Sequence, residues 1–166
     1  AAQKTRNNRI GIIGTEGTIR SEAYTKAIRK LIPEAMVFSQ ACPLFVPIVE
    51  EGWQNDPVAE QIARHYLDYF RDKDIDTLVL GCTHYPLLSA VIQKVLGPKV
   101  TLVDSAESIA EYLKQLLPSD SDGRQGLDSF YVSDNEGKFA QISNRILEHE
   151  LSFLKRVRLF ESWFTD

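Results

Sequence analysis

The segment with the clearest chemical potential is Gly-Cys-Thr-His-Tyr-Pro at residues 81–86. It directly follows an apolar run at 76–80 (DTLVL) that predicts a buried strand, and Pro86 predicts the start of a helix over 87–96. At a strand-to-helix junction, backbone N–H groups and the helix dipole favour an anion, so we expect Cys82 to form a thiolate readily. A cysteine that changes between thiol and thiolate can act as a nucleophile or as a general base.

The residues after Cys82 add to this potential. Thr83 offers a hydroxyl, and His84 offers an imidazole that can bind a carboxylate or assist proton transfer at the thiol. The competing interpretation is that Cys82 fills the end of a strand as a small hydrophobic residue, which is the usual role of an isolated buried cysteine. The local pattern leaves both interpretations open.

The surrounding elements predict how this segment is positioned. Short apolar or β-branched runs predict strands at 9–13, 36–39, 76–80 and 100–103. Helices are expected between and after them: from a Ser21 cap to about Leu31, from Pro57 with Val58, Ile62, Tyr66 and Phe70 on its buried face, over 87–96, and from a Ser105 or Ser108 cap to near Leu117. The proline-interrupted run 41–49 (ACPLFVPIV) predicts an irregular segment or a short helix start.

Strands that alternate with helices predict an α/β fold with a parallel sheet built from βαβ units. Ligand sites in such sheets lie beyond the carboxyl ends of the strands. Three segments should therefore converge there: 14–18 (GTEGT), 81–86 (GCTHYP) and 103–105 (VDS).

The pattern changes after residue 118, so we expect an α/β domain over 1–118 and a linker and tail over 119–166. Residues 118–127 (PSDSDGRQGL) are polar, and they precede a predicted strand at 130–132 and a helix from 138 to about 154. The tail then carries large apolar side chains: Phe153, Val157, Leu159, Phe160, Trp163 and Phe164. These side chains need a surface to bury against, either on this sheet, on a further body of protein or in a homodimer.

The composition narrows the classes of function. A net charge of -4 and a pI near 5.4 argue against a nucleic-acid partner, because phosphate binding needs a basic face. No apolar run reaches the roughly 18 residues that span a bilayer, so we expect no membrane association and a cytoplasmic location. Cys42 and Cys82 are too few for a disulfide scaffold, and with His84 they fall short of the four ligands of a structural zinc site.

Three blocks of the sequence resemble the cofactor-independent glutamate racemases of the aspartate/glutamate racemase superfamily: LGCTHYPLL at 80–88, IGIIGTEGT at 10–18 and ACPLFVPIVEEG at 41–52. The resemblance implies glutamate as a small-molecule substrate and no pyridoxal cofactor or metal. It also implies two cysteines that face each other across the substrate Cα, one removing a proton as thiolate and the other returning one as thiol. Cys82 corresponds to the second of these, and His84 to the neighbour that assists its proton transfer.

The resemblance assigns further residues. Thr15, Thr18 and Thr83 would bind the substrate carboxylate, although simple turn formation also explains Thr15 and Thr18. Glu50 would support the catalytic groups, with Glu51 as an equally plausible rival. Cys42 matches neither catalytic cysteine and is assigned to packing, while His65 and His149 are expected to be ordinary surface or half-buried residues.

The sequence departs from the family in one large respect. The family's first domain, with its Asp-Ser segment, Tyr-Gly pair and first cysteine, has no counterpart here. Residues 1–118 therefore resemble the second, catalytic α/β domain, and the tail resembles the segment that completes the first. We expect this chain alone to be inactive, and the whole enzyme to supply D-glutamate for peptidoglycan and cell shape. An aspartate racemase, a related decarboxylase and a non-catalytic binding module of the same fold remain as alternatives.

Overall fold

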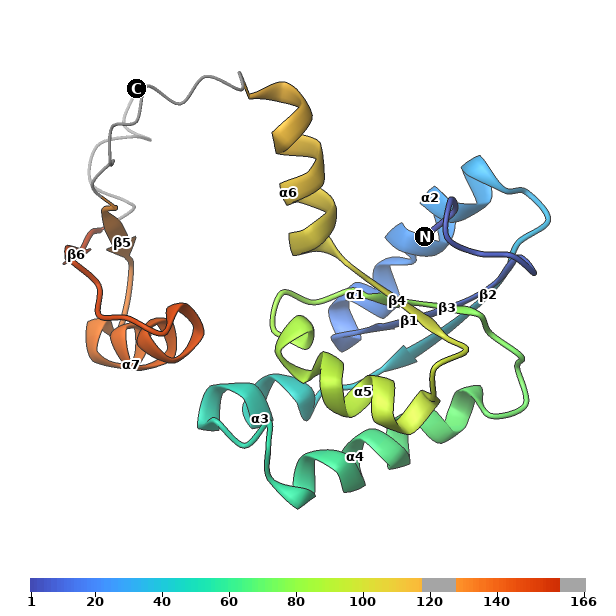
Figure 1. Cartoon of the computed structure of the whole chain (residues 1–166), viewed down its shortest axis with the longest axis horizontal. Helices are drawn as coiled ribbons and strands as arrows, with labels where there is room; N and C mark the ends of the chain where they lie inside the picture. The colour runs from blue at the N-terminus through green and yellow to red at the C-terminus, as the bar shows by residue number, and fades with distance from the viewer. Residues whose placement is uncertain (118–127, 159–166) are drawn as a thin grey trace. The chain divides into compact units, whose positions relative to one another are not determined.

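The computed structural model describes residues 1–117 and 128–158, which belong to two compact units, Ala1–Pro118 and Ser119–Asp166. Figure 1 labels the α-helices and strands of the first unit, which are β1 (Arg9–Gly14), α1 (Glu16–Ser21), α2 (Ala23–Leu31), β2 (Met36–Ala41), α3 (Phe45–Glu51), α4 (Pro57–Leu67), β3 (Thr77–Leu80), α5 (Ser89–Leu96), β4 (Thr101–Asp104) and α6 (Ser105–Leu116). Two 3-10 turns, η1 (Asp68–Phe70) and η2 (Tyr85–Leu88), complete this unit.

The four strands of this unit form one parallel sheet in the order β2-β1-β3-β4. Ile10 of β1 pairs with Val37 on one side and with Thr77 on the other, and Thr77 in turn pairs with Thr101. Because all four strands run in the same direction, their carboxyl ends meet at one edge of the sheet. The prediction of a parallel α/β fold is confirmed.

The two faces of the sheet are buried under separate groups of helices. Ile13, Leu78 and Leu80 pack into a core with residues of α3, α4 and α5, which lie together on one side of the sheet (Figure 1). Ile10, Ile12 and Val79 face the opposite side, where the core includes Ile28 of α2. The central strands are therefore apolar on both faces, as expected for a parallel sheet covered by helices on both sides.

The helix α4 begins as the sequence predicts, and its buried face is wider than the predicted stripe. Asp56 caps it by accepting a hydrogen bond from the Val58 N–H at 2.8 Å, and Pro57 occupies its first turn. Its deeply buried residues are Ala59, Ala63 and Leu67. Of the expected stripe, Phe70 just after the helix is buried, Ile62 and Tyr66 are half-buried against the core, and Val58 is half-buried. The small alanine side chains let the helix lie close to its neighbours, which apolar spacing alone does not reveal.

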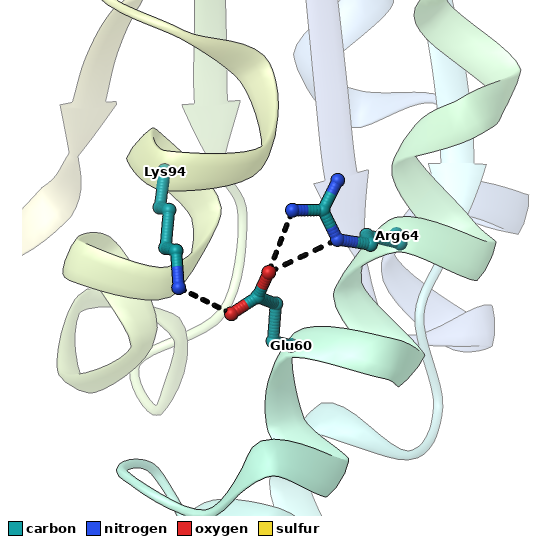
Figure 2. A network of polar contacts seen from close by, with 3 residues as sticks. All are labelled: Glu60, Arg64 and Lys94. Carbon is teal, nitrogen blue, oxygen red and sulfur yellow. Dashed lines mark hydrogen bonds and ion pairs between the residues drawn. The ribbon is translucent and has the colours of Figure 1, made fainter.

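Polar contacts on the outer surface join α4 to α5. Figure 2 shows that the Glu60 carboxylate accepts hydrogen bonds from Arg64 one turn along α4, at 2.6 Å, and from Lys94 of α5, at 2.5 Å. The Arg64 and Lys94 side chains are largely exposed, so these ion pairs contribute little to the stability of the fold.

Two predicted helix caps are wrong. Ser21 ends α1 instead of starting a long helix: Thr15 caps α1, and Glu22 in a left-handed conformation (φ 54°) separates α1 from α2. Asp104, and neither Ser105 nor Ser108, caps α6 by accepting from the Glu107 N–H at 2.8 Å. In both places, several residues of capping type stand close together, and the turn geometry selects between them.

Asp76, immediately before β3, ties the amino-terminal segment to the sheet. Its carboxylate accepts hydrogen bonds from the backbone N–H groups of Arg6 (2.6 Å) and Asn7 (2.9 Å) and from the hydroxyls of Thr5 (2.8 Å) and Thr77 (2.9 Å). Burial opposes ionisation, but these hydrogen bonds outweigh it and hold the pKa of Asp76 below its usual value.

The second unit is a small βαβ arrangement. It contains β5 (Phe130–Val132), α7 (Glu136–Leu147) and β6 (Leu154–Arg156), and the two strands pair in parallel. The predicted helix to about residue 154 is too long, because Glu148 adopts a left-handed conformation (φ 58°) and ends α7. The predicted linker 118–127 and the tail residues Leu159, Phe160, Trp163 and Phe164 lie outside the described residues.

Within 1–117 and 128–158, no helix combines the length and the apolar character needed to cross a lipid bilayer.

Candidate functional site

The turns that follow β1, β2 and β3 are hydrogen-bonded side by side at the carboxyl edge of the sheet. The Gly81 N–H donates to the Ile13 carbonyl at 2.8 Å, and the Cys42 N–H donates to the Gly14 carbonyl at 2.9 Å. The three sequence blocks that stand far apart in the chain therefore meet at one edge, where ligand sites of parallel sheets lie.

Gly81 lets the cysteine-bearing turn approach its neighbours closely. A Cβ at position 81 would lie 2.8 Å from the Ile13 carbonyl oxygen, 3.1 Å from the Tyr24 ring and 3.5 Å from the Thr18 methyl group. These distances place the Thr18 side chain beside the residue that precedes Cys82. A larger residue at position 81 would separate the two turns.

Cys82, His84 and Glu50 form a line of polar groups at this edge. Cys82 Sγ lies 3.9 Å from His84 Nδ1, and His84 Nε2 lies 3.6 Å from Glu50 Oε1. The Cys82 thiol is partly exposed, and the side chains of His84 and Glu50 are 33% and 31% exposed, so solvent reaches the line. Two elements supply it: the turn between β3 and η2, and the helix α3.

This arrangement is suited to moving a proton on and off the thiol. A carboxylate that faces Nε2 favours the imidazole tautomer with its hydrogen on Nε2, which leaves Nδ1 free to accept the thiol proton. The same imidazole can return that proton once Sγ carries a negative charge. Glu51, the rival of Glu50, is an exposed residue at the end of α3.

The three threonines occupy different positions. Thr15 Oγ1 accepts from the Thr18 N–H at 3.3 Å and lies 3.0 Å from Thr18 Oγ1, so Thr15 has the capping role of a turn residue. Both side chains are half-buried at the carboxyl edge, whereas Thr83 is exposed next to Cys82. Their hydroxyls and the adjacent N–H groups offer hydrogen bonds to an anion at this edge.

Cys42 differs from Cys82 in every respect that matters for proton transfer. Its side chain is completely buried, its Sγ lies 3.8 Å from the Gln40 carbonyl, and burial raises its pKa to about 12. It stays a neutral thiol at physiological pH and packs into the core beneath α3. His65 and His149 are exposed, His149 in the second unit.

Sequence reasoning did not single out Tyr85. Its ring is completely buried, its hydroxyl donates to the Cys42 carbonyl at 2.8 Å, and its ring packs edge-on against Phe45 at 5.2 Å. A tyrosine placed between a candidate catalytic histidine and a helix-starting proline was the available signal, because a buried phenol usually has a specific hydrogen-bond partner.

In the part of the chain that the structure describes, no group of three or more histidine, cysteine, aspartate or glutamate side chains is arranged to hold a metal ion.

The chain is similar in sequence to known proteins. Residues 1–113 match the protein-family model described as Asp/Glu/Hydantoin racemase. Curated relatives include the glutamate racemase of Geobacter metallireducens, 48% identical over 163 residues, which covers 96% of this chain and 60% of that protein. The glutamate racemase of Lactiplantibacillus plantarum is 42% identical over 154 residues, which covers 89% of this chain and 56% of that protein.

Solved structures of similar proteins share the fold of this chain. A glutamate racemase isoform from Bacillus anthracis superposes with a TM-score of 0.84 at 36% identity, over 96% of this chain and 60% of that one. The glutamate racemase of Francisella tularensis, solved in complex with D-glutamate, superposes with a TM-score of 0.77 at 37% identity, over 92% of this chain and 59% of that one. This chain thus spans about 60% of the length of the relatives it matches. With its family match over most of its length and this fold, the chain belongs to the Asp/Glu/hydantoin racemase family.

Proposed function

We propose that the protein interconverts L- and D-glutamate by proton transfer at the substrate Cα, with Cys82 as one of two acid/base groups. The observation that carries this proposal is the line from Glu50 through His84 to Cys82 at the carboxyl edge of the sheet. The names of the relatives and the D-glutamate bound to the Francisella tularensis structure support glutamate as the substrate.

The proposed chemistry uses the thiol in both of its protonation states. As thiolate, Cys82 takes the Cα proton from one face, and the electron pair of the broken C–H bond remains on a planar carbanion next to the substrate carboxylate. A proton delivered to the opposite face by a second acid then inverts the centre. In the reverse direction, Cys82 gives its proton to the carbanion, and His84 adjusts the protonation of Sγ between turnovers.

The remaining residues of the site have supporting roles in this proposal. Thr15, Thr18 and Thr83 hydrogen-bond the substrate carboxylate through hydroxyl and N–H groups, which stabilises the charge that develops during proton removal. Glu50 orients the His84 ring through Nε2. Neither a metal nor an organic cofactor has a part in these steps.

The second acid cannot be the other cysteine of this chain. Cys42 is completely buried, so its sulfur cannot reach a substrate at the sheet edge, and its raised pKa opposes the thiolate that the reverse direction requires. We therefore propose that residues 1–118 form one catalytic half, that a second thiol comes from protein outside these 166 residues, and that these residues alone are inactive.

The tail is proposed to complete that other half. The βαβ unit of 128–158 carries exposed large apolar side chains, including Tyr131 (60% exposed) and Phe153 (45% exposed), which indicate a surface meant to be covered. Its sheet has only two strands of three residues each, which give it little apolar surface of its own to bury.

In the cell, the proposed enzyme works in the cytoplasm, supplies D-glutamate for peptidoglycan and thereby supports cell shape. The apolar tail also makes a homodimer the proposed state of the isolated chain, which size-exclusion chromatography at two concentrations would check.

The direct test follows the glutamate Hα signal by proton NMR in deuterated water, with the complete gene product that contains these residues. Exchange should fall by about 100-fold or more in Cys82→Ser, because general acid–base catalysis supplies that much. Cys42→Ala is the matched control and should keep exchange. Aspartate should exchange more slowly than glutamate. An unchanged rate in Cys82→Ser refutes the role of Cys82, and rapid turnover by residues 1–166 alone refutes the external thiol.

A further inference from the structure

Tyr85 connects the two elements that carry the proton-transfer line. It follows His84 directly in the chain, and its hydroxyl donates to the carbonyl of Cys42, 43 residues away, at 2.8 Å. Cys42 stands just before α3, the helix that carries Glu50. One buried hydrogen bond thus joins the backbone leading into α3 to the residue next to His84.

A ring contact strengthens this connection. The rings of Phe45, the first residue of α3, and Tyr85 meet edge-on at 5.2 Å between centroids, and both side chains are completely buried. Phe45 also meets Tyr66 of α4 edge-on at 5.5 Å, and Tyr66 accepts a hydrogen bond from the Leu44 N–H at 3.4 Å. The start of α3 is therefore fixed on two sides by aromatic residues.

Burial also keeps the hydroxyl in its donating form. Transfer of the phenol into the core, together with the nearby thiols of Cys42 and Cys82, raises the pKa of Tyr85 well above its usual value. Since a protonated phenol donates and the Cys42 carbonyl accepts, the hydrogen bond persists across the physiological pH range.

We propose that Tyr85 is a positioning residue that sets the distance between α3 and the η2 turn, and thereby holds Glu50 in contact with His84. The contact of 3.6 Å between His84 Nε2 and Glu50 Oε1 is long for a hydrogen bond, so a small displacement of α3 would end it. The Tyr85 backbone N–H also donates to the Cys82 carbonyl at 3.1 Å, a contact that Tyr85→Phe leaves in place, whereas the hydroxyl acts on the thiol through α3 and Glu50. This inference rests on the proposed role of Cys82 as an acid/base group.

The test measures the reactivity of the Cys82 thiol, which needs no racemisation. In the 166-residue chain, the rate of alkylation by iodoacetamide at neutral pH is compared for the unaltered protein, Tyr85→Phe, Glu50→Gln and the double variant, with peptide mass spectrometry to separate Cys82 from Cys42. Each single change should slow alkylation about fivefold, the equivalent of one ordinary hydrogen bond. The double variant should react no more slowly than Glu50→Gln alone.

A matched control separates positioning from general loosening. Thr77 is also completely buried and donates its hydroxyl to Asp76, but at the opposite end of β3 from Cys82. Thr77→Val should lower the denaturation midpoint as Tyr85→Phe does, yet leave alkylation unchanged. Phe45→Leu provides a second variant, which loses the ring contact, keeps the Tyr85 hydroxyl and should slow alkylation in the same direction.

Several outcomes overturn the inference: an unchanged rate in Tyr85→Phe, effects of Tyr85→Phe and Glu50→Gln that multiply in the double variant, or equal slowing in Thr77→Val. The inference and the proposed function fail separately. If glutamate exchange is normal but the alkylation rates of the single and double variants do not follow the expected pattern, the role of Tyr85 is rejected. If the alkylation rates follow that pattern but glutamate does not exchange, the proposed function is rejected.

Discussion

Gly81 donates its backbone N–H to the Ile13 carbonyl at 2.8 Å, and the space above its Cα is occupied by that same oxygen. The position therefore has room for a hydrogen and for nothing larger. This single hydrogen bond brings the cysteine turn after β3 against the threonine turn after β1.

Gly81→Ala should destabilise the fold. The new Cβ would meet a backbone oxygen in the centre of the sheet, which cannot move aside as a flexible side chain can. The expected loss in the free energy of unfolding is about 1–3 kcal/mol, measured by urea denaturation. Gly17→Ala is the matched control: the nearest atom to its new Cβ is 4.0 Å away, within α1, and the protein should be unchanged or slightly more stable. Equal losses in both variants would contradict the packing argument.

Asp76 should make stability dependent on acidic pH. Its pKa is lowered in the folded protein, so its contribution is complete above the unfolded value, near 3.9, and is lost as the pH falls through the folded value. Asp76→Asn should cost about 1–3 kcal/mol at neutral pH, because an amide cannot accept all four hydrogen bonds. The difference in unfolding free energy between the two proteins should shrink as the pH falls below the unfolded value; a constant difference would exclude the linkage.

Cys42 should make stability dependent on alkaline pH with the opposite sign. Its pKa rises from 9.0 to about 12 on folding, so the unfolded chain ionises first and stability falls as the pH rises through this window. The loss attributable to this thiol is at most about 1.4 kcal/mol per pH unit. Cys42→Ala keeps every lysine and tyrosine of the unaltered protein. The difference between the free energies of unfolding of the two proteins therefore reports the Cys42 thiol alone. If the two proteins lose stability in parallel, the thiol is not responsible.

Glu50 and Glu51 are adjacent glutamates in different environments, which makes them a matched pair. Glu50→Gln removes the carboxylate that faces His84 Nε2, and we expect glutamate exchange in the complete gene product to fall about tenfold. Glu51→Gln changes an exposed side chain and should leave exchange unaltered. The reverse ranking of the two variants would transfer the supporting role to Glu51.

The sequence was a good guide to elements that depend on local pattern. The apolar runs at 76–80 and 100–103 became β3 and β4 with shifts of one residue, and Pro57 opens α4 as expected. Boundaries were less predictable. Thr15, Ser21 and Glu22 lie within one stretch, and only the left-handed conformation of Glu22 decides that two short helices form there.

Contacts between distant residues could not be predicted from spacing. The partner of His84 lies 34 positions earlier in the chain, and the acceptor of the Tyr85 hydroxyl lies 43 positions earlier. Motif resemblance named Glu50 and His84 but gave no distance between them. It placed Tyr85 within the 80–88 block but gave no partner for its hydroxyl, because that partner depends on three-dimensional packing.

The central place of β3 has a consequence for the geometry of the proposed proton transfer. This strand has a hydrogen-bonded neighbour on each side and an apolar core on each face. The backbone at Cys82, two residues after the strand, is therefore held at one place on the edge of the sheet. In the proposed reaction, the thiol then approaches Cα from the same side for both enantiomers. The two enantiomers would differ in how their own substituents are turned at the end of the sheet.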